Sequence, residues 1–324
     1  MRSAKFGVLG EVSRLTLGGG GIGQIWGETS KEEALATLHA ALDGGIDLID
    51  CAPLYANCER FVGEAFVGAP PSHVRFTTKC FLGTPPKGEA VERLETSLNA
   101  SLDAMRLPRI DIFFLHSNIC ADDYVYARGA DQQDQFATRW SAYAEEIVPA
   151  MEALTRDGRI GAWGITGSGV PDAIIRALKH EPKPRFVQAV TNLLDSAGSL
   201  RRYAESAKPR AIIRAANEAG VPVLGIRAVQ AGALTASIDR TLSPNNPDTK
   251  DYERAAPFRA LCAQWGEDPA YVAHRYALSM EGPATIILGV KNRAELAQCL
   301  KAETDGPYSP EEMAAIDGLG LRAA

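Results

Sequence analysis

Short apolar segments recur along the whole chain, and a stretch with helical periodicity follows each of them. The segments predict strands at 14–19, 46–50, 75–79, 110–116, 160–166, 186–190, 221–226 and 285–290. Strands as apolar as these, separated by helices, indicate a parallel sheet whose faces are covered. Eight such units over about 300 residues fit a closed (β/α)8 TIM barrel better than an open sheet. The sequence therefore predicts an α/β protein with one domain, residues 1–324.

Two helix starts and one long insertion refine this prediction. Ser30 and Glu33 have the spacing of a capping box that opens a helix ending at Gly44, and Ser309 with Glu312 repeats the pattern near the C-terminus. Residues 117–144 form a polar and aromatic insertion after the strand at 110–116. Loops of that length are usually functional or disordered.

Composition excludes several classes of partner. The 34 basic and 40 acidic residues are interspersed, with a net charge of -6, so there is no basic stripe for nucleic acid. No apolar run approaches the roughly 20 residues of a membrane span, and the N-terminus lacks the apolar core of a signal peptide. The six cysteines include no CxxC pair and the five histidines no metal-ligand spacing. We therefore expect a cytoplasmic protein with reduced thiols, no metal and no nucleic-acid or membrane partner.

A glycine motif near the N-terminus admits two interpretations. "GGGGIG" satisfies GxGxxG through Gly18, Gly20 and Gly23, and Asp50 ends the next strand, where a dinucleotide-binding fold places its ribose-binding acid. However, the predicted helix starts at Ser30 rather than at the glycines, and the acid lies 27 residues beyond Gly23 instead of about 20. These two details favour a flexible turn after the first strand.

Four residues with reactive side chains follow three consecutive strands. Asp50 ends one strand, Tyr55 lies in the loop after it, Lys79 ends the next strand and His116 the one after. Each alone has a structural explanation: a helix cap, loop packing, a solvated strand end or a core histidine. In a TIM barrel, however, the C-terminal ends of the strands meet at one mouth, where active sites form. Their joint occurrence there predicts a catalytic site.

These residues carry a resemblance to a known family. The order D-x4-Y, "TTK" and "LH" resembles the aldo-keto reductase superfamily, and "GGIDLIDCAPLYANCERFVGEAF" is similar to its signature segment, including Glu59 and Gly63. The similarity extends through "RIGAWGIT" and "FVQAVTNLL" to "TIILGVKNRAEL". The resemblance implies a (β/α)8 barrel that binds NADPH and interconverts carbonyls and alcohols, acting on a small aldehyde, ketone or sugar.

Elementary chemistry gives the four residues distinct roles. Carbonyl reduction needs a hydride donor and an acid for the developing alkoxide. Free tyrosine has a pKa of about 10, and a nearby ammonium lowers it. We therefore expect Lys79 to lower the pKa of Tyr55, the proton donor, and Asp50 to keep Lys79 charged. His116 would hydrogen-bond the substrate oxygen through a neutral ring.

The resemblance also implies a set of cofactor contacts. Gln188 matches the glutamine that binds the nicotinamide carboxamide, Ile226 stands where an aromatic ring often stacks on the nicotinamide, and Arg227 and Gln230 follow within reach of the pyrophosphate. The cofactor residues that it implies are Thr166, Gln188, Ile226, Arg227, Gln230, Gly232, Gly289, Lys291, Asn292 and Glu295.

The residues expected to hold the adenosine end of the cofactor depart from the family pattern. Lys291, Asn292 and Arg293 lie at a helix start, which suits a phosphate. Glu295 falls where some relatives carry an arginine, and a carboxylate there opposes a 2'-phosphate. NADPH is the expected cofactor, with NADH as the alternative.

The sequence constrains the substrate pocket and the biological role less than it constrains the candidate catalytic residues. Trp26 and Leu54 could line the pocket, as could aromatic residues of the insertion, namely Tyr124, Tyr126, Phe136 and Trp140. A cofactor-binding regulatory or sensor module of the same fold with little turnover is the alternative function. A dehydrogenase with a Rossmann fold would give Tyr55, Lys79 and His116 no joint role. The sequence leaves the oligomeric state open.

Overall fold

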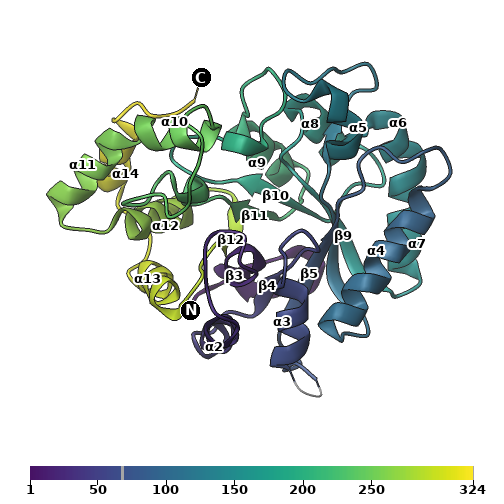
Figure 1. Cartoon of the computed structure of the whole chain (residues 1–324), viewed down its shortest axis with the longest axis horizontal. Coiled ribbons are helices and arrows are strands. Elements are labelled where there is room, and N and C mark those ends of the chain that lie inside the picture. The colour runs from purple at the N-terminus through teal and green to yellow at the C-terminus, as the bar shows by residue number, and fades with distance from the viewer. Residues whose placement is uncertain (67–68, 324) are drawn as a thin grey trace.

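A computed structural model describes residues 1–66 and 69–323 of the chain, and its central element is a closed barrel (Figure 1). Eight parallel strands close in the order β10-β11-β12-β3-β4-β5-β6-β9. They are β3 (Leu15–Gly18), β4 (Leu48–Asp50), β5 (Arg75–Cys80), β6 (Ile110–Leu115), β9 (Ile160–Thr166), β10 (Phe186–Val190), β11 (Val223–Ile226) and β12 (Pro283–Leu288). The predicted (β/α)8 TIM barrel is confirmed.

Helices surround the barrel, as Figure 1 shows. Their apolar faces are buried against it. The helices are α2 (Lys31–Asp43), α3 (Cys58–Ala65), α4 (Ala90–Met105), α7 (Val148–Arg156), α8 (Pro171–Lys179), α9 (Pro209–Glu218), α10 (Pro247–Arg254), α11 (Ala256–Trp265), α12 (Pro269–Ser279), α13 (Arg293–Thr304) and α14 (Pro310–Asp317). The signature glycine Gly63 lets α3 approach α4, because a Cβ there would lie 2.2 Å from the carbonyl oxygen of Ala104.

An antiparallel hairpin that the strand pattern did not predict closes the N-terminal end of the barrel. It pairs β1 (Ser3–Lys5) with β2 (Glu11–Ser13). Phe6, in the connection between them, is fully buried, and its ring centroid lies 4.6 Å from that of Phe186 at the start of β10. The hairpin and Phe6 therefore close this end of the barrel. The opposite end, where the strands finish, is the open mouth.

The glycine segment forms a tightly packed helical turn, α1 (Gly19–Ile22), instead of the flexible turn that we expected. A Cβ on Gly18 would lie 2.0 Å from the carbonyl oxygen of Leu288, and one on Gly21 would lie 1.9 Å from that of Val290. The glycines are therefore required by close backbone packing against β12 and the residues that follow it.

The two predicted capping boxes differ in outcome. At α14, the Ser309 side chain accepts from the Glu312 amide while the Glu312 carboxylate accepts from the Ser309 amide, so the box is complete. At α2, Ser30 accepts from the Glu33 amide, but the Glu33 carboxylate pairs with Arg293. The first box is therefore only half formed, because a long-range ion pair takes its second partner.

The insertion at 117–144 is ordered and contains its own two-stranded parallel sheet. β7 (Asn118–Cys120) pairs with β8 (Ala137–Arg139). Between and after them lie the turns η2 (Ala130–Gln132), α5 (Gln133–Phe136) and α6 (Trp140–Ala142), and a π-helical segment, η3 (Tyr143–Ile147), leads into α7.

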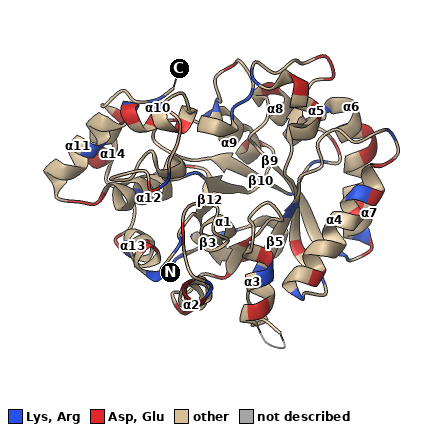
Figure 2. Ribbon diagram, in the orientation of Figure 1, with Lys and Arg blue, Asp and Glu red and all other residues tan. Residues whose placement is uncertain are grey.

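Acidic and basic residues are mixed along the outer helices, for example on α3, α4 and α7 (Figure 2). None of the described helices is long and apolar enough to cross a membrane. All six cysteines are free and buried. The described part of the chain contains no cluster of three or more potential metal ligands.

Candidate active site

A buried ion pair lies at the mouth of the barrel, where β4 and β5 end. The Lys79 ammonium donates to the Asp50 carboxylate at 2.7 Å and to the carbonyl oxygen of Cys51 at 2.7 Å. The exposed fraction is 0% for the Lys79 side chain and 2% for that of Asp50. Because the two strands are adjacent and parallel, their last residues meet without any contribution from the loops.

Two further donors complete the environment of Asp50. The Thr77 hydroxyl donates to its carboxylate at 2.6 Å, and the Gln188 amide nitrogen donates at 2.7 Å. A buried carboxylate is stable when it is paired and hydrogen-bonded. The apolar strand thus ends on a charge that has three side-chain partners.

Tyr55 and His116 lie directly above this ion pair. The Lys79 nitrogen is 4.5 Å from the centroid of the Tyr55 ring. The Tyr55 and His116 rings are perpendicular, with their centroids 5.9 Å apart. All four residues that were predicted from the strand ends are therefore brought together.

Burial outweighs the nearby ammonium in setting the pKa of Tyr55. Desolvation raises this pKa to about 12, although Lys79 opposes the shift. The expected effect of Lys79 is present, but the effect of burial is larger, so the net shift of the Tyr55 pKa is upward. Burial alone would lower the pKa of Lys79, but the Asp50 carboxylate and the Tyr55 side chain raise it above its ordinary value. At neutral pH, Lys79 is charged and Tyr55 keeps its proton.

His116 is neutral, as expected. Burial, reinforced by the charge of Lys79, lowers its pKa to about 3. Its Nδ1 atom is buried and has no hydrogen-bond partner among the described residues. The ring also faces Phe81, with centroids 5.9 Å apart. A neutral imidazole in this position has hydrogen-bonding capacity available for a ligand.

One cavity of about 790 Å³ opens above these residues, a volume typical of ligand sites. Asp50, Tyr55 and His116 line it, whereas Lys79 does not. Eight predicted cofactor residues also line this cavity: Thr166, Gln188, Ile226, Arg227, Gly232, Gly289, Lys291 and Glu295. The other two, Gln230 and Asn292, do not.

The model of the Aldo/keto reductase family matches residues 14–320. The chain belongs to this family. It is 23% identical over 309 residues to the L-galactose dehydrogenase of Arabidopsis thaliana, which covers 91% of this chain and 85% of that protein. Aldo-keto reductases interconvert carbonyls and alcohols with NAD(P)(H), so this chain is an oxidoreductase.

Solved structures of aldo-keto reductases have the same fold. The glycerol dehydrogenase AKR11B4 from Gluconobacter oxydans superposes with a TM-score of 0.70 at 22% identity, covering 98% of this chain and 94% of its own. The aldo-keto reductase AKR11C1 from Bacillus halodurans, in its holo form, gives a TM-score of 0.71 at 20% identity, covering 98% and 96%.

Within this aldo-keto reductase, two of the predicted cofactor residues lie beside the four residues of the candidate site. The Gln188 nitrogen is held by Asp50, and its amide oxygen accepts no hydrogen bond from the described residues. The Thr166 hydroxyl donates to the carbonyl oxygens of Leu115 and His116, at 3.3 and 3.2 Å. Ile226, at the end of β11, contributes an aliphatic surface to the cavity.

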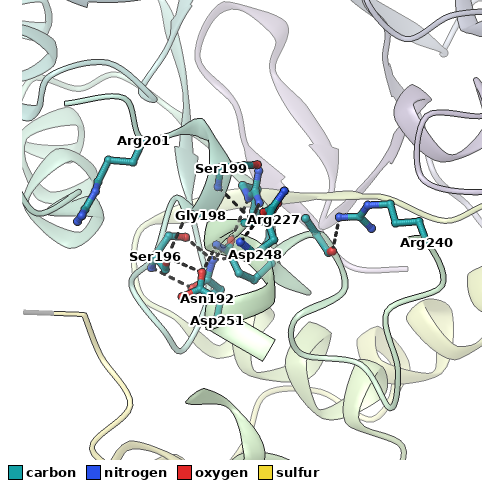
Figure 3. Close-up of polar contacts among 12 residues, drawn as sticks. Asn192, Ser196, Gly198, Ser199, Arg201, Arg227, Arg240, Asp248 and Asp251 are labelled. Carbon is teal, nitrogen blue, oxygen red and sulfur yellow. Dashed lines mark hydrogen bonds and ion pairs between the residues drawn. The ribbon is translucent and has the colours of Figure 1, made fainter. Parts of the chain in front are cut away.

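Arg227 and Gln230 take part in a buried polar network, which Figure 3 shows. The Arg227 guanidinium donates to Asp248 at 2.6 Å and to the Gln230 amide oxygen at 2.9 Å. The Gln230 nitrogen donates to Asp251 at 2.7 Å, which ties the loop after β11 to α10. The prediction that Gln230 reaches a pyrophosphate is not supported, because its side chain is fully buried in this network.

The opposite end of the cavity is dominated by Lys291. Its ammonium is 2.6 Å from the Asp239 carboxylate and 2.7 Å from that of Glu295. Asn292 caps α13 by accepting from the Glu295 amide at 2.9 Å, which explains why it does not face the cavity. Arg293 pairs with Glu33. Asp239 lies in a loop without periodicity, so no pattern in the sequence predicts its position.

The aromatic residues of the insertion divide into two groups. Phe136 lines the cavity, together with Trp26 and Leu54, as predicted. Tyr124, Tyr126 and Trp140 do not line it; Trp140, for example, packs against Tyr143 and under the guanidinium of Arg176. Sequence reasoning missed Phe81 and Arg202, which both line the cavity.

Proposed function

We propose that this aldo-keto reductase interconverts an aldehyde, ketone or sugar carbonyl and the corresponding alcohol by hydride transfer, with Tyr55 as the proton donor. The observation that carries the proposal is the buried Asp50–Lys79 pair beneath Tyr55, in a cavity that Tyr55 shares with a neutral His116. A nicotinamide cofactor, when bound, supplies the hydride.

The electrostatics suit a tyrosine that releases its proton only during the reaction. With a pKa raised to about 12, Tyr55 stays protonated at neutral pH and acts as an acid. As the proton leaves, the phenolate develops charge beside the Lys79 ammonium, in a site of low dielectric where that interaction is strong. Asp50 keeps Lys79 charged and in place.

His116 positions the substrate. Its ring is perpendicular to that of Tyr55 and neutral across the physiological pH range. One nitrogen of a neutral imidazole donates a hydrogen bond, so the ring can hold a carbonyl oxygen within reach of the phenol.

The residues that line the cavity fit a nicotinamide. Gln188 offers a free amide oxygen to a carboxamide nitrogen, and Ile226 offers an apolar surface to one face of a ring. Gln188 also contacts Asp50, so cofactor binding and the catalytic group share a residue.

Replacing Tyr55 by Phe tests the proposal. Loss of the acid should lower kcat for carbonyl reduction by about 10²–10⁴-fold, while the dissociation constant of the cofactor stays the same. Tyr143→Phe is the matched control, because the buried Tyr143 hydroxyl has no hydrogen-bond partner among the described residues. Full reduction activity in Tyr55→Phe would refute the assignment.

Turnover of the wild-type protein tests the alternative function. We would follow NADH and NADPH absorbance against a panel of aldehydes, ketones and sugars, in both directions. Tight cofactor binding without turnover of any member would favour the regulatory or sensor module instead. A cytoplasmic location also stays a prediction.

The choice of cofactor depends on the charges around Lys291. The family resemblance favours NADP(H), and Lys291 is a suitable cation for a 2'-phosphate. Asp239 and Glu295 already pair with it, however, so two carboxylates flank one ammonium. A phosphate dianion would meet like charge there, and this arrangement favours NAD(H).

A further inference from the structure

Arg202 lies on the wall of the catalytic cavity and was not predicted from the sequence. It follows the turn η4 (Gly198–Leu200) in the loop after β10. Its backbone is fixed independently of its side chain, because its carbonyl oxygen accepts from the Arg128 amide of the insertion at 3.2 Å. The Arg128 guanidinium also donates to the carbonyl oxygens of Ser199 and Arg201. The loop therefore presents a half-buried guanidinium to the cavity from a tethered position.

A continuous aromatic wall connects this guanidinium to the catalytic histidine. The guanidinium carbon of Arg202 lies 3.8 Å from the centroid of the Phe136 ring. The Phe136 ring contacts that of Phe81 at 5.7 Å, and Phe81 contacts His116 at 5.9 Å. Arg202 thus belongs to the part of the cavity nearest the proposed carbonyl site, with the length of two rings between the cation and the imidazole.

Arg202 differs from the other cations that line the cavity because its side chain has no hydrogen-bond or ion-pair partner among the described residues. Arg227 pairs with Asp248, Lys291 with Asp239 and Glu295, and Arg240 donates to the carbonyl oxygen of Ala231. The Arg202 guanidinium makes no hydrogen bond or ion pair with any described residue. Burial and the nearby Arg128 lower the pKa of Arg202, whereas Tyr126 opposes them.

Because the Arg202 guanidinium has no carboxylate partner, its charge and its N–H donors are available to a ligand in the cavity. Stacking on Phe136 compensates part of the charge through the face of the guanidinium, but it leaves the in-plane N–H groups free. A planar fork of donors matches a carboxylate, and also a phosphate, through paired charge-assisted hydrogen bonds.

We propose that Arg202 binds an anionic group of the substrate, so that the preferred carbonyl compounds carry a carboxylate or phosphate at a distance from the reacting carbon. This inference rests on the proposed function, because it assigns the reacting carbonyl to Tyr55 and His116. The Phe81–Phe136 wall sets the spacing and favours an apolar segment between the two ends. A 2-oxo acid, with its charge next to the carbonyl, is too short.

A pair of aldehydes that differ by one carboxylate group tests the proposal. 4-Carboxybenzaldehyde and benzaldehyde share the ring and the aldehyde. For the wild-type enzyme we expect kcat/KM to be at least about tenfold higher for the carboxylate, mainly through KM. In Arg202→Met, which keeps the length and removes the charge, the two values should become similar, mainly through a loss for the carboxylate. Arg202→Lys should give an intermediate ratio, because it keeps the charge and loses the fork.

Arg201→Met is the matched control. Arg201 is the neighbouring arginine, its side chain is exposed, and Figure 3 shows it turned away from the polar network. This variant should behave as wild type. Equal turnover of the two aldehydes by the wild type, or an equal loss for both in Arg202→Met, would overturn the proposal. A weaker dissociation constant for the cofactor in Arg202→Met would assign the guanidinium to the cofactor instead, and would also overturn it.

A binding measurement separates this inference from the proposed function. Benzoate should bind the cofactor-loaded wild type more tightly than benzamide, as measured by calorimetry, and Arg202→Met should abolish the difference. If no member of the carbonyl panel is turned over, these two aldehydes included, but benzoate shows this preference, the proposed reaction fails and the anion site stands. If both aldehydes are turned over without a benzoate preference, the anion site fails alone.

Discussion

The two ends of the cavity contain ion pairs with similar distances but different physical environments. At the catalytic end, Lys79 and Asp50 lie 2.7 Å apart with almost no exposure. At the other end, Lys291 lies 2.6 Å from Asp239 and 2.7 Å from Glu295, whose side chains are 43% and 36% exposed. The first pair is one cation with one carboxylate; the second group has a surplus of negative charge.

Burial and charge balance decide what each group can do. In the low dielectric beneath Tyr55, removal of one partner leaves a charge that water cannot solvate. Near the surface, water and salt screen the charges, so a single substitution changes the local potential modestly. The catalytic pair is therefore suited to fixing a protonation state, and the Lys291 group to selecting a ligand by its charge.

Lys79→Met should have the largest effect. Without the ammonium, the phenolate of Tyr55 has no stabilising charge, and we expect kcat/KM for reduction to fall by about 10³-fold or more. Asp50 would be left buried and unpaired, at a cost of about 3–5 kcal/mol in the free energy of unfolding. Steady-state kinetics and urea denaturation measure the two effects.

A double variant separates catalysis from stability in this experiment. Asp50→Asn combined with Lys79→Met removes both charges and should regain part of the lost stability while staying inactive. Activity within tenfold of wild type in Lys79→Met would contradict the role of Lys79. Recovery of activity in the double variant would show that the single substitution acted through the fold.

The contrast between the two ends of the cavity also explains which site residues could be predicted from the sequence. Asp50, Lys79 and His116 lie at the ends of strands, and the parallel register of β4, β5 and β6 fixes their meeting. Strand ends follow from apolar patterns, so the meeting of these residues was predictable. Arg202 lies in a loop whose position depends on contacts with the insertion, and Asp239 lies in a loop whose position depends on its contact with Lys291. These contacts are long-range, so no local sequence pattern predicts them.

Fold elements that depend on short or polar segments were also missed. The strands at 160–166 and 186–190 were predicted with their observed bounds, because each is a long apolar run. β1 has three residues, Ser3–Lys5, with no alternating apolar pattern, and it exists because Phe6 enters the barrel end. The net direction of the Tyr55 pKa shift was not predicted for a similar reason, because the depth of burial, which outweighs the effect of Lys79, cannot be inferred from spacing.

Substitutions at the Lys291 end should produce a smaller effect that depends on the cofactor. Glu295→Gln and Asp239→Asn each remove a negative charge, and we expect the dissociation constant of NADPH to fall by roughly three- to tenfold while that of NADH changes little. Quenching of protein fluorescence measures both constants. The effect should weaken at high salt.

One control variant and two possible results test whether these carboxylates act on a 2'-phosphate. Glu89→Gln removes an acid that pairs with Arg93 on the surface of α4 and should change neither constant. Tighter NADPH than NADH binding by the wild type would restore the expectation from the family resemblance. Equal changes for both cofactors in Glu295→Gln would show that the carboxylate does not act on a 2'-phosphate.

The last prediction concerns the pH dependence of stability at His116. Its pKa is about 3 in the folded protein and about 6.5 in an unfolded chain, so the unfolded state binds the proton first as the pH falls. Stability is therefore complete above pH 6.5 and is lost progressively down to about pH 3. Between pH 7 and 5 we expect a loss of about 1–2 kcal/mol from this group, reduced by the partial exposure of the ring. His116→Gln should lose that part of the slope in urea denaturation, whereas His73→Gln, at an exposed position, should keep it. If the two variants gave the same slope, protonation of His116 would not be linked to unfolding, and the neutral ring assigned to substrate binding would lose its support.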